Sequence, residues 1–321
     1  MKKILITGGA GFIGSNFTRL ALNSNYSVVV FDKLTYAGNL STLEDISAHP
    51  NYIFIKGDIS DREHVDAVFS NHNFNYVINF AAESHVDRSI SDPDVFIKSN
   101  IMGVQVLLEA CRNHNTQRYL QVSTDEVYGS LGDTGLFTED TPLDPSSPYS
   151  SSKAGADLLV QAWHRTFGLN ALITRCSNNY GPYQYPEKLI PLMISKALNH
   201  QSLPVYGDGS NIRDWIHVED HCDALLCVLE RGESGRVYNI GGKSECSNLD
   251  VVKRILDILD RPHDLIAFVT DRLGHDWRYA IDNTRIQSEL GWKPKHDFTS
   301  GLKHTIDWYL ENKEWWQPLI K

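Results

Sequence analysis

Two residues four positions apart, Tyr149 and Lys153, have the types and spacing of a proton-transfer pair. They follow Pro148, and positions i and i+4 put both side chains on one face of a helix. An ammonium group beside a phenol lowers its pKa, so we expect Lys153 to lower the pKa of Tyr149. The tyrosine could then take a proton from an alcohol while hydride leaves the same carbon. Most pairs at this spacing only pack on a helix surface, so the interpretation depends on their surroundings.

Two carboxylates and a hydroxyl, Thr124-Asp125-Glu126, follow the apolar run 119–123. If that run is a strand of a parallel sheet, the three side chains stand where such sheets bind ligands, beyond the carboxyl ends of the strands. Mutual repulsion and unequal solvation can drive the pKa values of neighbouring acids apart, which leaves one to act as an acid and the other as a base. The alternative is a loop of solvated acids.

A glycine-rich turn near the start of the chain indicates a dinucleotide site. Gly8, Gly11 and Gly14 separate an apolar run from a segment of helical spacing, and they let the backbone approach a pyrophosphate. The following helix would add free N–H groups and the positive end of its dipole. Asp32 ends the next apolar run. In dinucleotide-binding folds an acid at this position binds the ribose hydroxyls, and its charge would repel a ribose phosphate. We therefore expect NAD rather than NADP. Asp58 stands where an adenine contact would be, although a simple turn acid explains it nearly as well.

Strand-like and helix-like segments alternate along the chain. They predict an α/β fold, a Rossmann-type doubly wound parallel sheet with a smaller C-terminal α/β substrate-binding lobe. The expected strands are 3–7, 28–32, 52–56, 76–80, 119–123 and 172–175. The expected helices are 12–22, 62–70, 95–113, 149–167, 248–260 and 300–311. We expect residues 1–177, together with about 212–240, to form the NAD-binding domain, and residues 178–211 and 241–321 to form the second lobe.

Composition and charge argue against several classes of protein. The chain has 321 residues, 41% of them hydrophobic, and a net charge of −10, which disfavours disorder and a nucleic-acid surface. No apolar stretch is long enough to span a membrane, so we expect a cytoplasmic protein without nucleic-acid or membrane partners. No CxxC pair and no Cys/His cluster with zinc spacing occurs, so we expect free thiols and no metal site. The cysteines are Cys111, Cys176, Cys222, Cys227 and Cys246.

Several longer runs resemble the extended short-chain dehydrogenase/reductase family and, within it, the dTDP-glucose 4,6-dehydratases. The glycine turn and the Tyr149/Lys153 pair resemble the wider family, and the adjacent acids Asp125 and Glu126 are the most discriminating part. Further similar runs are 32–39, 81–88, 178–184, 187–191, 204–209, 213–215, 274–276 and 278–279. The resemblance therefore covers nearly the whole chain.

This resemblance implies NAD-dependent dehydration of dTDP-glucose to dTDP-4-keto-6-deoxyglucose, in deoxysugar (rhamnose-type) nucleotide biosynthesis. Tyr149, beside Lys153, would remove the proton of the C4 hydroxyl, and Thr124 would hold that oxygen. Glu126 would take the C5 hydrogen as a base, and Asp125 would protonate the leaving C6 hydroxyl. Since the NAD would lend and recover one hydride, the enzyme would be a lyase with internally recycled NAD.

The resemblance also implies two sets of binding residues and a homodimer built from segments 95–113 and 149–167. Those segments could equally serve the core of one subunit. The expected NAD-binding residues are Gly8, Gly11, Phe12, Ile13, Gly14, Asp32, Lys33, Leu34, Thr35, Asp58, Ile59, Ala81, Ala82, Ser99, Tyr149, Lys153 and Asn179. The expected sugar-nucleotide-binding residues are Ser84, Thr124, Asn178, Lys188, Leu189, Pro204, Tyr206, Arg213, Asn248, Arg272 and His275. Asn248 also fits the N-cap of a helix.

Three other classes of function remain open at this point. A UDP-hexose 4-epimerase or a UDP-glucuronate decarboxylase would share the glycine turn and the Tyr–Lys pair, but an epimerase needs no acid–base pair for water loss. An alcohol dehydrogenase would exchange NAD with solution and make no dehydrated product. An inactive NAD-binding regulator would have lost the tyrosine, lysine or carboxylates, and all are present. The residues alone do not decide between thymidine and uridine as the base.

Overall fold

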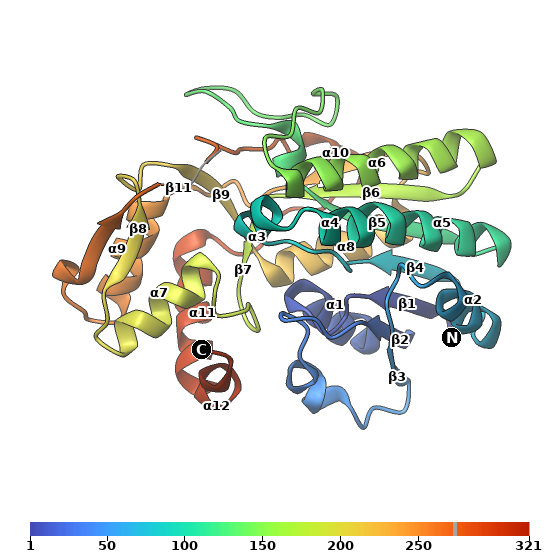
Figure 1. The fold of residues 1–321 in the computed structure, drawn as a ribbon, viewed down its shortest axis with the longest axis horizontal. Coiled ribbons are helices and arrows are strands. Elements are labelled where there is room, and N and C mark those ends of the chain that lie inside the picture. The colour runs from blue at the N-terminus through green and yellow to red at the C-terminus, as the bar shows by residue number, and fades with distance from the viewer. Residues whose placement is uncertain (272–274, 321) are drawn as a thin grey trace.

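The structure is a computed structural model of the chain, described here for residues 1–271 and 275–320 (Figure 1). Within these residues the largest sheet has seven strands, all parallel, in the order β10-β6-β5-β4-β1-β2-β3. Its strands are β1 (Lys3–Thr7), β2 (Ser27–Asp32), β3 (Tyr52–Lys56), β4 (Tyr76–Asn79), β5 (Arg118–Thr124), β6 (Ala171–Cys176) and β10 (Val237–Ile240). The strand order reverses between β1 and β4, which is the position where open α/β sheets bind their ligands.

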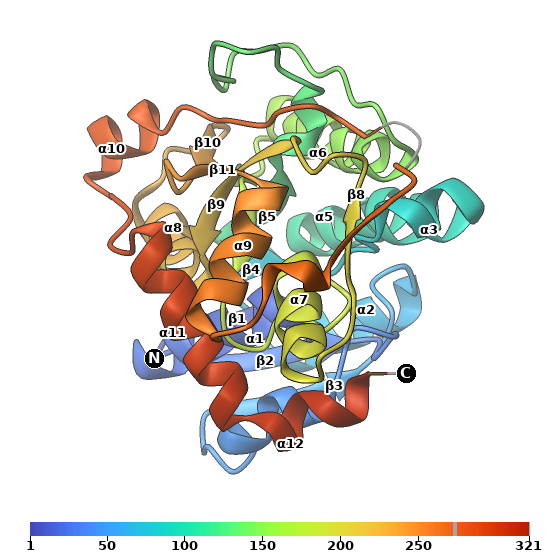
Figure 2. The same cartoon turned by 90° about the vertical axis from the view of Figure 1, so that its left-hand side faces the viewer.

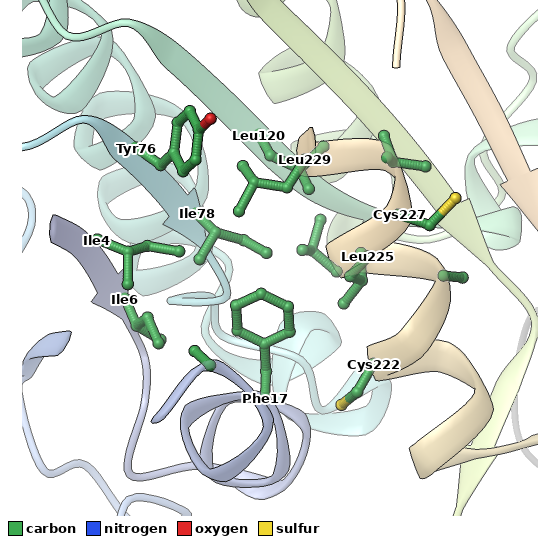
Figure 3. Close-up of a cluster of buried hydrophobic side chains, with 14 of the residues drawn as sticks. Ile4, Ile6, Phe17, Tyr76, Ile78, Leu120, Cys222, Leu225, Cys227 and Leu229 are labelled. Carbon is green, nitrogen blue, oxygen red and sulfur yellow. The ribbon is translucent and has the colours of Figure 1, made fainter. Parts of the chain in front are cut away.

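Helices cover both faces of this sheet (Figures 1 and 2). On one face lie α1 (Phe12–Asn23), α8 (Val218–Arg231) and α10 (Thr284–Leu290), and on the other lie α2 (Arg62–Asn71), α5 (Gly103–Asn113) and α6 (Pro148–Phe167). Successive side chains of a strand point to opposite faces, so Ile4 packs in the first layer and Leu5 in the second. Figure 3 shows Phe17 of α1 and Leu225 of α8 pointing toward the sheet. Because both faces are buried, the central strands β1, β2 and β4 are largely continuous apolar runs, as the sequence suggested, whereas the edge strand β3 is only partly buried.

A second, smaller region follows β6 along the chain. It contains the sheet β11-β9-β7 and the strand pair β12-β8. The strands are β7 (Asn178–Tyr180), β8 (Leu203–Tyr206), β9 (Ile212–His217), β11 (Glu245–Ser247) and β12 (Ile266–Val269). The helices are α7 (Leu189–Leu198), α9 (Asn248–Ile258), α11 (Phe298–Glu311) and α12 (Lys313–Trp316). Their buried side chains form a separate core, and this two-part α/β architecture confirms the predicted fold class.

Short helical turns complete the chain. They are η1 (Leu40–Ile46), α3 (Val86–Ser91), η3 (Asp125–Tyr128), η4 (His263–Leu265) and η5 (Gln317–Leu319). The five cysteines are buried and unpaired, as expected. In the described residues, no helix combines the length and apolar character needed to cross a bilayer.

The predicted strands are all present, and most predicted helices end within two residues of their expected bounds. The segment 95–113 differs, because it is not one α-helix. It divides into α4 (Asp94–Phe96), a π-helical segment η2 (Ile97–Met102) and α5. In η2, the buried Asn100 amide donates to the Glu83 carbonyl and to Ser152 Oγ, while Ser99 faces the cavity described below. A π-helical turn of this kind often marks a functional site.

The start of α9 also differs from expectation. Ser247, not Asn248, is the N-cap, because its backbone is extended and its hydroxyl accepts the N–H of Asp250. Asn248 is the first helical residue, and its N–H donates to the carbonyl of Asn211. The predicted N-cap was therefore wrong by one residue.

One buried ion pair joins α6 to the sheet. Arg175 Nε of β6 lies 2.8 Å from Asp157 Oδ2 of α6, and the two side chains are 2% and 0% exposed. Arg175 also donates to the hydroxyl of Tyr128, which in turn donates to Asn239 Oδ1 at 2.8 Å. The pair therefore fixes η3, the turn that carries the two acids of the predicted site.

We expect Asp157→Asn to lower the free energy of unfolding by about 3–5 kcal/mol, because it leaves the Arg175 guanidinium buried without its counterion. The matched control is Asp307→Asn, which removes an exposed ion pair with Lys303 of the same 2.8 Å length and should cost less than about 1 kcal/mol. Urea unfolding of both variants measures the difference. Equal losses would contradict a structural role for the buried pair.

Candidate active site

A cavity of about 350 Å³ opens at the carboxyl ends of the parallel strands. It brings together the glycine turn after β1, the acids after β5 and the Tyr149/Lys153 pair of α6. Every predicted catalytic residue lines it, as do these predicted binding residues: Gly8, Gly11, Phe12, Ile13, Gly14, Asp32, Lys33, Thr35, Asp58, Ile59, Ala81, Ala82, Ser84, Ser99, Asn178, Asn179 and Lys188. Segments far apart in the sequence therefore meet in one site.

The glycine turn leaves no room for side chains. Gly8 has a φ of +69°, and a Cβ there would lie 2.5 Å from the Ala81 nitrogen. A Cβ on Gly14 would lie 2.3 Å from the Gly8 carbonyl oxygen. Helix α1 begins after Gly11, which offers no capping side chain, so the first N–H groups of the helix lack a capping partner. This bare helix start, open to the cavity, fits a pyrophosphate.

Asp32, at the end of β2, is held by the backbone on both sides. Its Oδ2 accepts the N–H of Ala10 at 2.9 Å, and its Oδ1 accepts the N–H of Leu34 at 2.7 Å. Burial raises its pKa, although these two hydrogen bonds oppose the shift. Each oxygen keeps a second lone pair, so the carboxylate can also accept two ribose hydroxyls. Leu34 itself does not line the cavity, and its N–H orients Asp32 instead.

Asp58 and Lys33 form an ion pair at the rim of the same cavity, with 2.8 Å between Oδ2 and Nζ. Burial would raise the pKa of Asp58, but hydrogen bonds from Lys33 and Ser60 outweigh it and lower the pKa. The carboxylate is therefore charged. Its place beside the glycine turn fits a contact with an adenosine group.

Tyr149 and Lys153 both face the cavity from the start of α6, as the spacing predicted. The predicted effect of the lysine on the tyrosine was wrong. Lys153 Nζ donates to the carbonyl of Val122 at 2.8 Å, and burial lowers its pKa. Burial, and then Glu126 and Cys176, raise the pKa of Tyr149 well above its ordinary value, and a hydrogen bond with Thr124 offsets only part of this. Burial therefore dominates the pKa of Tyr149.

The two acids of η3 have unequal surroundings. Asp125 is 1% exposed, and its Oδ2 has no hydrogen-bond partner in the described part of the chain. Burial, then the charges of Glu126 and Asp214, raise the pKa of Asp125 well above its ordinary value, so its neutral form is favoured. Glu126 is only partly buried, and Thr124 Oγ1 accepts its N–H at 3.3 Å. A neutral acid beside a more solvated carboxyl group is the arrangement that acid–base elimination requires.

The remaining predicted substrate residues lie in the smaller region. Leu189, Pro204, Tyr206, Arg213, Asn248 and His275 do not line the cavity, and Arg272 lies outside the described residues. Arg213 lies over the Tyr279 ring at 4.4 Å and donates to the carbonyl of Asp276. His275 faces Tyr206, with ring centroids 6.3 Å apart. The structure thus places these residues in the smaller region rather than on the cavity wall.

The cavity also contains side chains that the sequence analysis did not single out as site residues, although two of them lie in the runs that resemble the family. Tyr36 lies under the Arg88 guanidinium at 3.6 Å, and Glu187 lies 3.8 Å from the same guanidinium. Cys176 ends β6, and burial together with Asp125 raises its pKa to about 12, so it is a neutral thiol rather than a nucleophile. The position of Cys176 at the end of a parallel strand was a usable signal. The stacking of Tyr36 depends on tertiary contacts.

Comparisons with known proteins agree with this geometry. The family model described as GDP-mannose 4,6 dehydratase matches residues 5–305. The dTDP-glucose 4,6-dehydratase of Xanthomonas campestris pv. campestris (strain B100) is 52% identical over 98% of this chain and 95% of its own length.

Solved structures give the same result. The dTDP-glucose 4,6-dehydratase of Bacillus anthracis str. Ames in complex with NAD is 50% identical, with a TM-score of 0.94, and the match covers 99% of this chain and 100% of that one. The dTDP-glucose 4,6-dehydratase of Streptomyces venezuelae, also with NAD bound, is 47% identical with a TM-score of 0.96 over 99% of each chain. The chain therefore belongs to the GDP-mannose 4,6 dehydratase family of extended short-chain dehydrogenases/reductases.

Proposed function

We propose that this chain is an NAD-dependent hydro-lyase that converts dTDP-glucose to dTDP-4-keto-6-deoxyglucose, in deoxysugar nucleotide biosynthesis. The observation that carries the proposal is the buried Asp125 next to the more exposed Glu126, in one cavity with Tyr149. A redox change at one carbon alone would not need this acid pair. Relatives about half identical over nearly the full chain, named dTDP-glucose 4,6-dehydratase, support the choice of substrate.

NAD, when bound, would supply the hydride acceptor for C4 and the hydride donor for C6. The N–H groups at the start of α1 would hold the pyrophosphate, and Asp32 would accept the ribose hydroxyls. Lys33, Thr35, Asp58, Ile59, Ala81, Ala82, Ser99 and Asn179 would complete this part of the site. Leu34 would act indirectly, through the hydrogen bond of its N–H to Asp32.

Tyr149 would move the proton of the C4 hydroxyl. Burial favours its neutral phenol form, so the phenolate needs positive charge inside the cavity. Lys153 supplies that charge from one helical turn away and is anchored on the Val122 carbonyl. Thr124, which hydrogen-bonds with Tyr149, would hold the substrate oxygen between them.

Elimination would use the two acids in different roles. Oxidation at C4 acidifies the hydrogen on C5, and Glu126 would remove it as a proton and return a proton to C5 once hydride has been delivered to C6. Asp125, whose neutral form is favoured by burial, would give its proton to the C6 hydroxyl as water leaves. Its Oδ2, which has no hydrogen-bond partner among residues 1–271 and 275–320, would meet that hydroxyl.

The smaller region would bind the nucleotide end of the substrate. Ser84, Asn178 and Lys188 lie on the cavity wall and would contact the sugar side. Arg213 suits phosphate recognition because its guanidinium offers paired donors. Leu189, Pro204, Tyr206, Asn248 and His275 would surround the base and ribose. We assign residues 1–177 and about 212–240 to the NAD-binding domain and 178–211 and 241–321 to the sugar-nucleotide lobe, with Arg213 at the boundary, on a strand of the smaller sheet, reaching the substrate.

A cytoplasmic homodimer is part of the same proposal. Ile97 and Met102 of η2 and Leu158 of α6 are 45%, 53% and 56% exposed, and η2 and α6 contact each other. Apolar side chains gathered on adjacent helices are typical of a subunit interface. Five unpaired buried thiols fit a reducing compartment.

We expect Gly14→Ala to weaken NAD binding, on the order of tenfold or more, because the new Cβ would lie 2.3 Å from the Gly8 carbonyl oxygen and shift the turn. Gly132→Ala is the matched control, since a Cβ there meets nothing within 4 Å. Calorimetric titration with NAD measures both variants, after circular dichroism has shown that they are folded. Wild-type affinity in a folded Gly14→Ala variant would argue against a pyrophosphate at this turn.

Asp125→Asn and Glu126→Gln should each slow dehydration by about 10²–10⁴-fold while leaving NAD binding intact, because each removes one acid–base step. The assay incubates purified protein with dTDP-glucose or UDP-glucose, without added NAD, and measures the mass loss of one water. The exposed Asp140→Asn is the control and should behave like wild type. Near-normal product formation by both acid variants would refute the assigned roles.

The dehydration rate should fall as the pH rises through the raised pKa of Asp125, because only its protonated form can donate to the leaving hydroxyl. The wild-type enzyme should therefore be active at neutral pH, above the ordinary aspartate pKa of about 3.9. Single-turnover elimination rates across pH test this, with NAD binding measured at each pH as the control. A dehydration rate that already falls as the pH rises through about 3.9, the ordinary aspartate pKa, would contradict the prediction.

A further inference from the structure

Three histidines gather outside the active-site cavity. His217 ends β9 and accepts the N–H of Glu219 at the start of α8, His296 precedes α11, and His304 lies on α11. The ring centroids of His217 and His296 are 4.2 Å apart, and those of His217 and His304 are 5.4 Å apart. None of the three lines the cavity, so the proposed dehydration does not use them.

We propose that His217, Glu219 and His296 form a binding site for a divalent transition-metal ion of the zinc class. Glu219 Oε2 lies 3.9 Å from His217 Nδ1 and 3.5 Å from His296 Nε2, and three ligand atoms of the group lie within 4.8 Å of one another. Zinc bonds of about 2.0–2.1 Å in a tetrahedron put neighbouring ligand atoms about 3.3 Å apart. Small side-chain rotations would close the triangle to that size.

A buried carboxylate supports His296 from behind. Asp220 is 2% exposed, and its Oδ1 lies 3.1 Å from His296 Nδ1, the ring nitrogen that faces away from Glu219. Asp220 Oδ2 accepts the backbone N–H groups of Lys295 and His296. The approach lacks hydrogen-bond geometry, since His296 Nδ1 makes no hydrogen bond within the described residues, but a carboxylate this close to the second nitrogen can orient a metal-binding imidazole.

His217 is buried at the junction of β9 and α8. The residue is 1% exposed, and among the described residues its Nε2 has no hydrogen-bond partner. Its Nδ1, the nitrogen whose distance to Glu219 Oε2 is given above, accepts the backbone N–H of Glu219 at 3.4 Å. Coordination of the ion through Nδ1 would replace this long hydrogen bond.

The ligand types indicate the class of metal. Two imidazoles and one carboxylate suit Zn²⁺ and its transition-metal neighbours, whereas Mg²⁺ and Ca²⁺ prefer oxygen ligands. Water or His304 could complete the tetrahedron. The positive end of α8 opposes a cation, but the carboxylates of Glu219 and Asp220 bring two negative charges to the same turn.

The position of the site indicates a structural role. His217 and Glu219 lie where β9 meets α8, and α8 packs with α1 against the main sheet. His296 lies just before α11, which belongs to the smaller region. A shared ion would therefore tie the two parts of the protein together and stabilise the folded state by its binding free energy. Sequence spacing indicated no metal site, because His296 is far along the chain from the other two ligands.

The test uses untagged, EDTA-treated enzyme titrated with ZnCl₂ by calorimetry, followed by melting curves with and without Zn²⁺. We expect saturable binding at micromolar concentrations and a higher Tm with Zn²⁺, but no effect of Mg²⁺. His296→Gln and Glu219→Gln should each weaken Zn²⁺ binding at least about tenfold. His263→Gln, which removes an exposed histidine paired with Asp257 at 2.7 Å, should bind like wild type.

Co²⁺ provides an independent readout, because a tetrahedral site with nitrogen ligands gives it visible absorption bands that both ligand variants should lose. Both variants should keep wild-type dehydration activity, since neither residue lines the active-site cavity. Absence of saturable Zn²⁺ binding by the wild type would overturn the proposal. Undiminished binding by both variants would also overturn it, because the ion would then be bound elsewhere, for example by a cysteine.

Discussion

The free-energy cost of burying ionisable groups at the carboxyl end of β5 determines the pKa values in the candidate active site. Asp125, Tyr149 and Lys153 share one cavity, and burial is the largest cause of the pKa shift of each. Burial favours the neutral form, so it raises the pKa of the acids and lowers that of the lysine. Each buried polar atom left without a partner costs roughly 1–3 kcal/mol. Lys153 avoids this cost because its Nζ donates to a backbone carbonyl. Asp125 Oδ2 has no such partner among the described residues, and a substrate group would fit there.

Such a site needs a rigid support, because the acids stand on a short turn rather than on a long element. The support is the buried network beneath η3. Asp157 on α6 pairs with Arg175 on β6, Arg175 donates to Tyr128 at the end of the turn, and Tyr128 donates to Asn239 on β10. The same helix carries Tyr149 and Lys153. The two chemical groups are therefore held relative to each other through one helix and two neighbouring strands.

Helix α8 connects the cavity to the proposed metal site. His221, one turn beyond the N-cap His217, has its Nδ1 2.8 Å from Asn179 Oδ1, and Asn179 lines the cavity. An ion at the start of α8 would hold the helix that supports this wall. The proposed metal would thus act on the stability of the scaffold and not on the reacting atoms.

The sequence by itself determined the order of the elements and the identity of most cavity residues. Apolar runs buried on both faces marked the strands of the main sheet, and Gly8, Asp32, Thr124 and Tyr149 could be placed because a parallel sheet brings the carboxyl ends of its strands to one edge. Local rules were less reliable at the boundaries. The N-cap of α9 moved to Ser247, and the π-helical turn η2 interrupted a predicted helix around the buried Asn100.

Only the tertiary structure decided the pKa values and side-chain contacts at places where distant segments of the chain meet. The i, i+4 spacing placed Lys153 beside Tyr149, but it did not reveal that burial would raise the tyrosine's pKa. Nor did it show Arg88 over Tyr36, or His296 folded against His217 and Glu219. Spacing along a chain reports neighbours within one helix or strand. Desolvation and contacts between elements depend on how the whole chain packs, so they appear only once the fold is complete.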